Sequence, residues 1–469
     1  MARERLTHAA IRPVKQRIED ELLARPGVVG VDINEKVSKG KPTGQLAIVV
    51  YVEQKQPKSK LKSDELIPAE IDGIPTDVKE EKIELYTAKE ALLDVVGLVD
   101  ATKYTTLHGG ISMGPCRSVH LEPPEVDTAG DYIFVGTLGA IVRDRATQAA
   151  MALTNFHVAC IDNGWAVGNT MAQPARNDGG SCPGDVFGTL TRAALSNHVD
   201  GAVVAIDPSK VTDCSIEEIG AVRGQAVAAL NSAVRKRGRT TGLTHGTVNS
   251  VDATVTIDYG DGLGNHTLRN QVRIAPDTTQ SAQFSDHGDS GSVVVDAGNN
   301  VIALLFGGSP SATYANPIQF VLDELSVDLC IKPRVLLTRP VICEPLVTRV
   351  VVCNVKTTTI SCKIATRPAI CNVVTTPATC DVRTLAACPV ATAICPPQSL
   401  ACGPVRPVDP IGPIETPIGG QASGAPLGGL YGQPGADAVD EAFWLGYYSA
   451  LDALHQAEAE VDAEQSGRR

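Results

Sequence analysis

The stretch FSDHGDSGS, residues 284–292, constrains the fold most, because a serine between two glycines has few purely structural reasons to occur. A serine hydroxyl attacks a carbonyl only when a base takes its proton and backbone N–H groups face the developing oxyanion. The flanking glycines allow the chain to turn those N–H groups inward. We therefore predict that Ser290 is a nucleophile and that the N–H groups of Gly288 and Ser290 line an oxyanion hole.

A histidine and an acid that would complete a catalytic triad lie upstream of this serine. His157 lies in the run MALTNFHVAC, and Asp200 directly precedes a strand-like run in NHVDGAVVAI. The order is His, Asp, Ser, and the gaps of 43 and 90 residues leave each residue at the edge of a different strand in a two-lobed β fold. Asp178 and Asp185 are the alternative acids. We prefer Asp200, because Asp178 stands before two glycines, a pattern typical of a turn.

Together these motifs carry a family resemblance. TNFHVA, VDGAVVAI and GDSGS resemble, in order, the histidine, acid and serine motifs of the chymotrypsin/trypsin-like serine peptidases, including the intracellular narrow-leaf type trypsin-like proteins of bacteria and plants. The resemblance implies a mainly β fold, a two-lobed chymotrypsin-like double β-barrel over residues 109–330. It also implies that His157 is general base and then general acid, that Asp200 orients its ring, and that Ser290 forms the acyl-enzyme.

The resemblance also indicates where a substrate lies. The strand that contains Leu305, Phe306 and Gly307 corresponds to the one beside which the family lays its substrate backbone, which adds hydrogen bonds independent of side chains. Phe284, six positions before the serine, stands where the resembling trypsins hold an acid. An aromatic ring there offers no charge to Lys or Arg and would fill the pocket floor. We therefore expect a preference for small or medium apolar residues before the scissile bond.

Asp289, directly before the serine, needs a partner. In digestive relatives this acid pairs with a newly cut N-terminus, but here a long stretch of chain precedes the fold and the sequence shows no evident cleavage site. A buried unpaired carboxylate is costly, so we expect either a cluster of backbone N–H groups or a cation to meet Asp289.

The chain before residue 109 predicts a small α+β domain and a tether. Apolar residues recur every four positions from Val14 to Leu22, as on one face of a helix, and strand-like runs joined by turns follow. We expect residues 1–85 to form a docking or regulatory domain and residues 86–108 to form the tether.

Arg237 and Arg239 lie in a basic cluster, KRGRTTG. They would either contact a substrate or an acidic neighbour, or belong to a solvated turn. The solvated turn is favoured, because exposed charges usually contribute little.

Residues 331–402 form a repeat rich in Thr, Val, Pro and Cys, in which each unit ends in cysteine. The spacing of nine residues between these cysteines and the lack of an accompanying histidine argue against a metal site. An extended tether and a stack of short strands both remain open for this repeat. The spacing is set by Cys353, Cys362, Cys371 and Cys380.

The C-terminal part of the sequence predicts a Gly/Pro linker over residues 403–435 and an amphipathic helix over residues 436–465. An isolated helix of this kind is marginal in water, so its apolar stripe favours burial against the body of the protein or a second copy. We therefore expect a homo-oligomer through the C-terminal region or an intramolecular contact. The stripe consists of Trp444, Tyr447, Leu451 and Leu454.

Composition excludes several classes of protein. The formal net charge is −12 over 469 residues and the pI is near 5.3, which argues against nucleic acid or an anionic membrane as the main partner. Charges are scattered through the N-terminus without an apolar core, so it does not resemble a secretory signal. We therefore expect a cytoplasmic protein whose 13 cysteines are reduced thiols. No motif implies a cofactor.

Two classes of function follow from the sequence. The first is a soluble serine endopeptidase that hydrolyses protein or peptide substrates through the His-Asp-Ser triad, and an esterase with the same triad is a variant of it. The second is a catalytically weak or inactive trypsin-like scaffold that acts through protein–protein interaction. The intact triad favours the enzyme.

Overall fold

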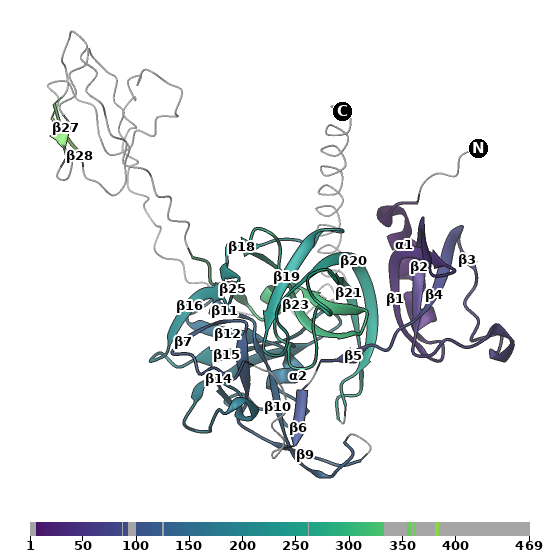
Figure 1. The fold of residues 1–469 in the computed structure, drawn as a ribbon, viewed down its shortest axis with the longest axis horizontal. Coiled ribbons are helices and arrows are strands. Elements are labelled where there is room, and N and C mark those ends of the chain that lie inside the picture. The colour runs from purple at the N-terminus through teal and green to yellow at the C-terminus, as the bar shows by residue number, and fades with distance from the viewer. Residues whose placement is uncertain are drawn as a thin grey trace, which may run out of the picture. The chain divides into compact units, whose positions relative to one another are not determined.

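The computed structural model of the chain describes residues 6–86, 88–91, 100–123, 126–260 and 262–332, and the short segments 354–357, 361–362 and 380–383. Contacts divide the described residues into two compact units, one up to residue 332 and one that holds the three short segments. The first unit is mainly β with few helices (Figure 1), which confirms the predicted fold class at that level.

One large sheet contains both N-terminal strands and the strands that surround the serine motif. Among the described residues it has twelve strands, ordered β19 (Ala233–Gly238), β22 (Val293–Val295), β23 (Asn300–Ser309), β24 (Ala312–Pro317), β21 (Asn265–Pro276), β20 (Gly242–Asp258), β1 (Val28–Ser38), β2 (Lys41–Val52), β4 (Ile74–Glu80) and β3 (Glu70–Ile71), with β5 (Glu84–Leu85) and β18 (Gly224–Gln225) paired to β23.

The second large sheet carries the strands around the histidine and acid motifs. In the described part of the chain its order is β25 (Val327–Leu329), β11 (Ala140–Asp144), β12 (Ala150–Thr154), β15 (Asp200–Ile206), β14 (Val186–Leu195), β13 (Thr170–Ala172), β8 (Ile111–Pro115), β10 (Gly130–Leu138) and β6 (Ala88–Ala91), with β9 (Val119–Leu121) paired to β10. A smaller sheet has the order β17 (Gly220–Ala221), β16 (Val211–Ile216) and β7 (Thr106–Gly109). The helical elements are α1 (His8–Leu23), α2 (Phe156–Ala159), α3 (Ile318–Glu324) and the 3₁₀ turns η1 (Lys58–Lys60) and η2 (Arg176–Asp178).

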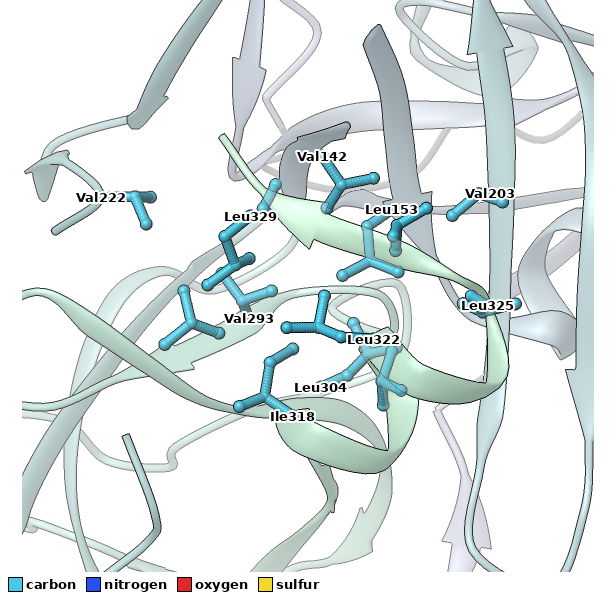
Figure 2. Packing of buried hydrophobic residues seen from close by; sticks show 14 of the residues in the cluster. Val142, Leu153, Val203, Val222, Val293, Leu304, Ile318, Leu322, Leu325 and Leu329 are labelled. Carbon is cyan, nitrogen blue, oxygen red and sulfur yellow. The ribbon is translucent and has the colours of Figure 1, made fainter. Parts of the chain in front are cut away.

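A shared apolar core holds the two large sheets together. Val142 of β11 and Leu153 of β12 pack in the same cluster as Leu304 of β23, and Leu322 of α3 lies among them (Figure 2). Each such side chain contributes about 1.5–3 kcal/mol when it is fully buried. This core fixes how the sheet that carries the histidine and acid meets the sheet that carries the serine.

The N-terminal region is joined to the rest of the unit by strand pairing, and a docking or regulatory domain over residues 1–85 stays a prediction. Helix α1 forms as predicted, with the Thr7 side chain accepting a hydrogen bond from the backbone N–H of Ala10 at its start. Strand β1, however, pairs antiparallel with β20, with Gly30 opposite Val255. The sequence could not reveal this, because the pairing joins strands more than 200 residues apart.

Buried charges reinforce this junction. The Arg12 guanidinium donates to the Asp252 carboxylate at 2.6 Å, and Lys15 bonds both Glu19 and Thr254 at 2.5 Å. Burial alone would raise the pKa of Asp252, but the His8 hydrogen bond and the Arg12 charge lower it to about 2. Asp252 therefore stays ionised over most of the pH range.

The expected tether over residues 86–108 is partly strand. β6 pairs antiparallel with β10, with Val135 opposite Ala88 and Tyr132 opposite Ala91. Strand β5, just before it, pairs with β23 of the other sheet. The chain therefore passes from one large sheet to the other over a few residues.

Two disulfides correct the expectation of reduced thiols. Cys116 is bonded to Cys182, and Cys214 to Cys330. Cys160 is a free, buried thiol whose pKa is raised, first by burial and then by the Asp200 charge. The expectation relied on the N-terminal sequence alone, which says nothing about which cysteines the fold brings together.

The described segments of the cysteine repeat form a small antiparallel sheet of their own, ordered β27 (Ser361–Cys362), β26 (Asn354–Thr357) and β28 (Cys380–Arg383). In these segments the short-strand alternative applies. The linker over 403–435 and the helix over 436–465, with its stripe from Trp444 to Leu454, lie outside the described residues.

Within the described residues, no helix is both long and apolar enough to cross a membrane. No group of three or more His, Cys, Asp or Glu side chains there is placed to hold a metal ion.

We predict that Asp252→Asn lowers the free energy of unfolding by about 3–5 kcal/mol, because it leaves the Arg12 charge buried without its counter-ion. Urea unfolding at neutral pH measures the change. Since the folded pKa of about 2 lies below the ordinary 3.8, the carboxylate stabilises the fold above pH 4 and this contribution fades as the pH falls toward 2.

Arg17→Ala is the control, because Arg17 lies on the same helix as Arg12 and its ion pair with Asp72 is exposed. It should cost about 0–1 kcal/mol. Equal losses in the two variants would contradict the role of the buried pair.

Candidate active site

The histidine and the acid are placed by neighbouring strands of the second sheet. Strand β12 ends at Thr154 and leads into the short helix α2, which carries His157, while Asp200 begins β15. Because β12 and β15 pair antiparallel, with Thr154 opposite Ala202, the end of one lies beside the start of the other. The Asn155 side chain donates to the Asp200 carbonyl at 2.7 Å and ties the two together.

His157 and Asp200 form a buried pair with the geometry that the triad requires. His157 Nδ1 lies 2.5 Å from Asp200 Oδ2, and the His157 backbone N–H donates to Asp200 Oδ1 at 3.2 Å. The side chains are 2% and 0% exposed. With Nδ1–H donated to the carboxylate, Nε2 is the basic nitrogen, and it is buried without a hydrogen-bond partner among the described residues.

The alternative acids have other partners. Arg239 donates to both oxygens of Asp178, at 2.8 and 2.5 Å, and Ser112 also donates to it. Asp185 accepts from Ser181 and pairs with Lys103. In the described structure Asp200 is therefore the acid that contacts His157.

Arg237 and Arg239 are not charges of a solvated turn, which corrects the favoured interpretation. Arg239 is buried against Asp178, and Arg237 pairs with Asp100 at 2.7 Å and with Glu218 at 3.2 Å. Both meet acidic neighbours, the alternative that was left open. Those neighbours are distant in sequence, so no local pattern could identify them.

Tyr259 is a site residue that the sequence did not indicate. Its hydroxyl donates to Asp200 Oδ2 at 2.8 Å, on the oxygen that also contacts His157. Burial, and then the Asp200 charge, raise the pKa of Tyr259, which keeps the hydroxyl protonated as a donor. Tyr259 follows β20 on the first sheet, so it links the acid to the sheet that carries the serine.

The nucleophile loop is held by Asp289, which confirms that a buried carboxylate here needs partners. Asp289 accepts from the backbone N–H groups of Thr240 and Thr241 at 2.9 and 3.1 Å, and from the Thr241 hydroxyl at 2.6 Å. The buried Lys236 ammonium lies 3.1 Å away. Both kinds of expected partner, the N–H cluster and the cation, are present.

Ser290 lies close to the histidine segment. Gly136 separates them, since a Cβ on this residue would meet the Val158 side chain at 2.6 Å and the Ser290 carbonyl at 3.0 Å. The Ser290 hydroxyl donates to the Phe306 carbonyl at 3.1 Å. In this structure the hydroxyl is therefore directed at Phe306 and not at His157.

Gly288 directs its backbone N–H at Tyr86. Its φ of +93° is a conformation that glycine adopts without steric cost. Its N–H donates to the carbonyl of Tyr86, a residue from the N-terminal side of the chain, at 2.9 Å. An N–H that bonds a carbonyl at this distance is what one half of an oxyanion hole requires. The Ser290 N–H as the second half stays a prediction.

The predicted substrate strand contributes backbone rather than side chains. The Phe306 carbonyl faces the nucleophile, and Gly307 pairs with Leu85 of β5. The Leu305 side chain is buried in the core, and its backbone bonds Gly291 and Ser292 of the serine motif. Leu305 thus supports the loop from behind.

Phe284 lines a small pocket of about 140 Å³ together with residues 285–287 of the serine motif, but it does not fill the pocket. Its ring packs into the core and is 2% exposed. The side chain of Tyr86 lines the same pocket and belongs to the same apolar cluster. The expected preference for small or medium apolar residues therefore stays a prediction, and an aromatic residue is the alternative.

A larger cleft of about 630 Å³ lies over His157 and Tyr259. It is bounded by Glu84 and Leu85 on one side and by Phe134 of β10 on the other. The cleft therefore runs between the two large sheets.

Comparisons with known proteins find likeness only in structure. No protein-family model matches the chain, and no curated protein matches it. Thermobifida fusca protease A is 19% identical with a TM-score of 0.35, and the match covers 48% of this chain and 100% of that one. A chymotrypsin of Cellulomonas bogoriensis is 18% identical with a TM-score of 0.32, covering 48% and 98%. A Nocardiopsis protease is 16% identical with a TM-score of 0.33, covering 47% and 97%.

Because these identities and TM-scores are low, they carry no conclusion about activity. The function proposed below rests on the geometry of the site.

We predict that Tyr259→Phe slows the reaction of Ser290 with a fluorophosphonate by about tenfold or more, because a hydrogen bond to a charged group contributes about 1.5–3 kcal/mol. Without it the Asp200 carboxylate is held less firmly against His157. The time course of labelling, followed by mass spectrometry, measures the change.

Tyr132→Phe serves as the control, since its hydroxyl donates to the Thr128 carbonyl, away from the acid. It should label at the wild-type rate. Wild-type labelling of a folded Tyr259→Phe variant would show that this hydroxyl has no positioning role.

Proposed function

We propose that the protein is a serine endopeptidase of the chymotrypsin-like double β-barrel type, with its two lobes formed by the two large sheets. The observation that carries the proposal is the buried contact of 2.5 Å between His157 Nδ1 and Asp200 Oδ2, which leaves Nε2 as the base. Such a histidine beside a serine whose loop aims an N–H at a carbonyl supports acyl transfer.

The reaction follows from these contacts. The Ser290 hydroxyl turns from Phe306 toward His157 Nε2, gives up its proton and attacks the substrate carbonyl. Asp200 stabilises the imidazolium that forms, and the Gly288 N–H stabilises the oxyanion. His157 then returns the proton to the leaving amine, and water hydrolyses the acyl-enzyme by the same steps in reverse.

A polypeptide is the substrate class that the cleft favours. Gly307 and Gly308 of β23 accept an extended chain as an antiparallel partner, as the pairing with Leu85 and Glu84 illustrates. Backbone pairing recognises peptides and has no counterpart in a simple ester.

The alternative, a weak or inactive scaffold, is favoured by one observation. The Ser290 hydroxyl donates to Phe306 and not to His157. The enzyme remains the stronger proposal, because the buried His157–Asp200 pair leaves His157 Nε2 without a hydrogen-bond partner among the described residues, as a general base requires.

The cellular setting stays open to test. A cytoplasmic location remains a prediction, and the two disulfides weigh against a reducing compartment. A homo-oligomer through the C-terminal region also remains a prediction.

We predict that Ser290→Ala abolishes fluorophosphonate labelling and peptide hydrolysis while the protein stays folded, with a loss on the order of a million-fold. Asp200→Asn should lose about ten-thousand-fold, because the histidine takes the wrong tautomer. Hydrolysis of a fluorogenic peptide library measures both.

Asp185→Asn is the matched control, as its carboxylate pairs with the exposed Lys103 away from His157. It should keep near wild-type activity. Activity that survives Ser290→Ala would overturn the proposed function.

We also expect cleavage to favour tyrosine before the scissile bond. The Tyr86 hydroxyl donates to the Ser309 carbonyl at 2.9 Å in the small pocket. A net hydrogen bond of about 0.5–1.5 kcal/mol predicts that tyrosine exceeds phenylalanine by roughly two- to tenfold in kcat/KM. Matched peptides that differ only at this residue provide the measurement, and faster cleavage after alanine would contradict it.

A further inference from the structure

We propose that Arg239 is a positioning residue for the oxyanion donor at Gly288. This inference rests on the proposed function, because it concerns the same site. Arg239 directly follows β19 of the sheet that carries the serine. Its ion pair with Asp178 reaches the segment between β13 and β14 of the sheet that carries the histidine. The pair therefore joins the two halves of the site.

The ion pair is bidentate and buried. Arg239 Nε donates to Asp178 Oδ2 at 2.8 Å and Nη2 donates to Oδ1 at 2.5 Å, and the two side chains are 4% and 0% exposed. The Ser112 hydroxyl of β8 donates to the same carboxylate at 2.5 Å. A planar guanidinium that meets both oxygens of a carboxylate is held in one orientation, which a lysine ammonium does not impose.

The guanidinium held in this way lies against the nucleophile loop. A Cβ on Gly288 would lie 3.0 Å from Arg239 Nη1 and closer still to the Thr240 hydroxyl oxygen. The Thr240 hydroxyl donates to the His287 carbonyl at 2.7 Å. Residues 239 and 240 thus pack on the backbone of the residue whose N–H is the proposed oxyanion donor.

Thr137 of β10 connects the same contacts to the histidine segment. Its hydroxyl accepts from the Arg239 N–H at 3.0 Å and donates to the Gly288 carbonyl at 3.0 Å. Its carbonyl accepts from the hydroxyl of Thr154, which precedes His157 by three residues. One series of hydrogen bonds therefore runs from the oxyanion donor to the segment that carries the base.

The oxyanion donor has to be placed relative to the base as well as to the nucleophile. Asp289 fixes the loop against the backbone of Thr240 and Thr241, which follow a strand of the same sheet as the serine. The Arg239–Asp178 pair attaches that turn to the other sheet. Because an oxyanion is stabilised by donors already in place when the charge develops, a displaced loop costs rate and not substrate binding.

A purely structural role for the pair makes a different prediction. A buried ion pair that only held the fold together would change the free energy of unfolding and leave the rate constant of the folded protein as it was. The test therefore uses variants that stay folded and separates the transition state from the bound substrate.

Arg239→Lys keeps a positive charge beside Asp178 but loses the bidentate contact. We expect kcat for a fluorogenic peptide to fall by about tenfold to a hundredfold while KM stays within about twofold, as misplacement of an oxyanion donor predicts. A peptide boronate, which forms a tetrahedral adduct with Ser290, should bind more weakly by the same factor. A peptide analogue that lacks the scissile carbonyl should bind as it does to the wild type, because it uses no oxyanion donor.

Arg237→Lys is the matched control. Arg237 lies two residues earlier, on β19, and pairs with Asp100 and Glu218. This variant should keep the wild-type kcat. Hydrogen exchange over residues 284–292, followed by mass spectrometry, should become faster in Arg239→Lys and stay unchanged in Arg237→Lys.

A double variant keeps the test decisive where Arg239→Lys does not fold. Asp178→Asn combined with Arg239→Gln leaves no buried charge unpaired, so the cost of an isolated charge does not arise. It should lose at least as much kcat as we expect of Arg239→Lys, with the same selective loss of boronate binding.

Fluorophosphonate labelling of the wild type separates the two proposals. A labelled wild type beside a folded Arg239→Lys with unchanged kcat and boronate affinity would overturn the inference and leave the peptidase standing. An equal loss of kcat in Arg237→Lys would also overturn it, because the effect would then not belong to the contact with Gly288. A wild type that neither hydrolyses peptides nor reacts with the fluorophosphonate would overturn the proposed function, and the inference with it.

Discussion

The buried carboxylate of Asp289 is the interaction on which the site depends. Moving an ionised group out of water costs several kcal/mol of free energy unless the group is paired and hydrogen-bonded. The Asp289 carboxylate is therefore stable only with partners, and these come from several segments of the chain. It draws in the Thr240–Thr241 turn and the Lys236 ammonium, and it accepts from the Asp286 N–H at 3.0 Å. These contacts clamp the residues on both sides of Gly288.

The clamp places the nucleophile rather than stabilising the fold. An apolar pair of similar volume would often be as stable as a buried ion pair. An apolar pair, however, would not fix the orientation of the surrounding backbone, because it makes no directional hydrogen bonds. Asp289 binds donors from two separate segments, which fixes the conformation in which the Gly288 N–H donates to the Tyr86 carbonyl. Burial, opposed by the Asp289 charge, lowers the pKa of Lys236, so the pair depends on both members.

The sequence predicted the parts of the site that local patterns encode. A local signal marks each of the three residues: flanking glycines for Ser290, a preceding apolar run for His157 and a following strand for Asp200. Their order along the chain then supported the assignment as a triad. Partners that come from distant strands carry no such signal. Tyr259, Lys236 and the Arg239–Asp178 pair became visible only when the sheets were assembled.

The same limit explains the N-terminal region and its path. Helix α1 and the strands after it follow from periodicity, but the pairing of β1 with β20 and the path of β5 along β23 join residues that are far apart. Glu81 helps to fix the position of the chain that leads into β5. It bonds Arg273 at 2.9 Å and Ser309 at 2.7 Å, and so anchors the chain just before it enters the cleft.

The Phe306 carbonyl connects occupation of the cleft to the state of the nucleophile. It accepts from both the Ser290 hydroxyl at 3.1 Å and the Tyr86 N–H at 3.2 Å. A buried carbonyl left without any donor costs about 1–3 kcal/mol, which would hold the serine away from His157 in an empty cleft. Once a peptide N–H occupies the second lone pair, release of the serine no longer leaves the carbonyl unpaired. A bound polypeptide therefore lowers the cost of turning Ser290 toward its base, while in the structure itself both donors share the carbonyl.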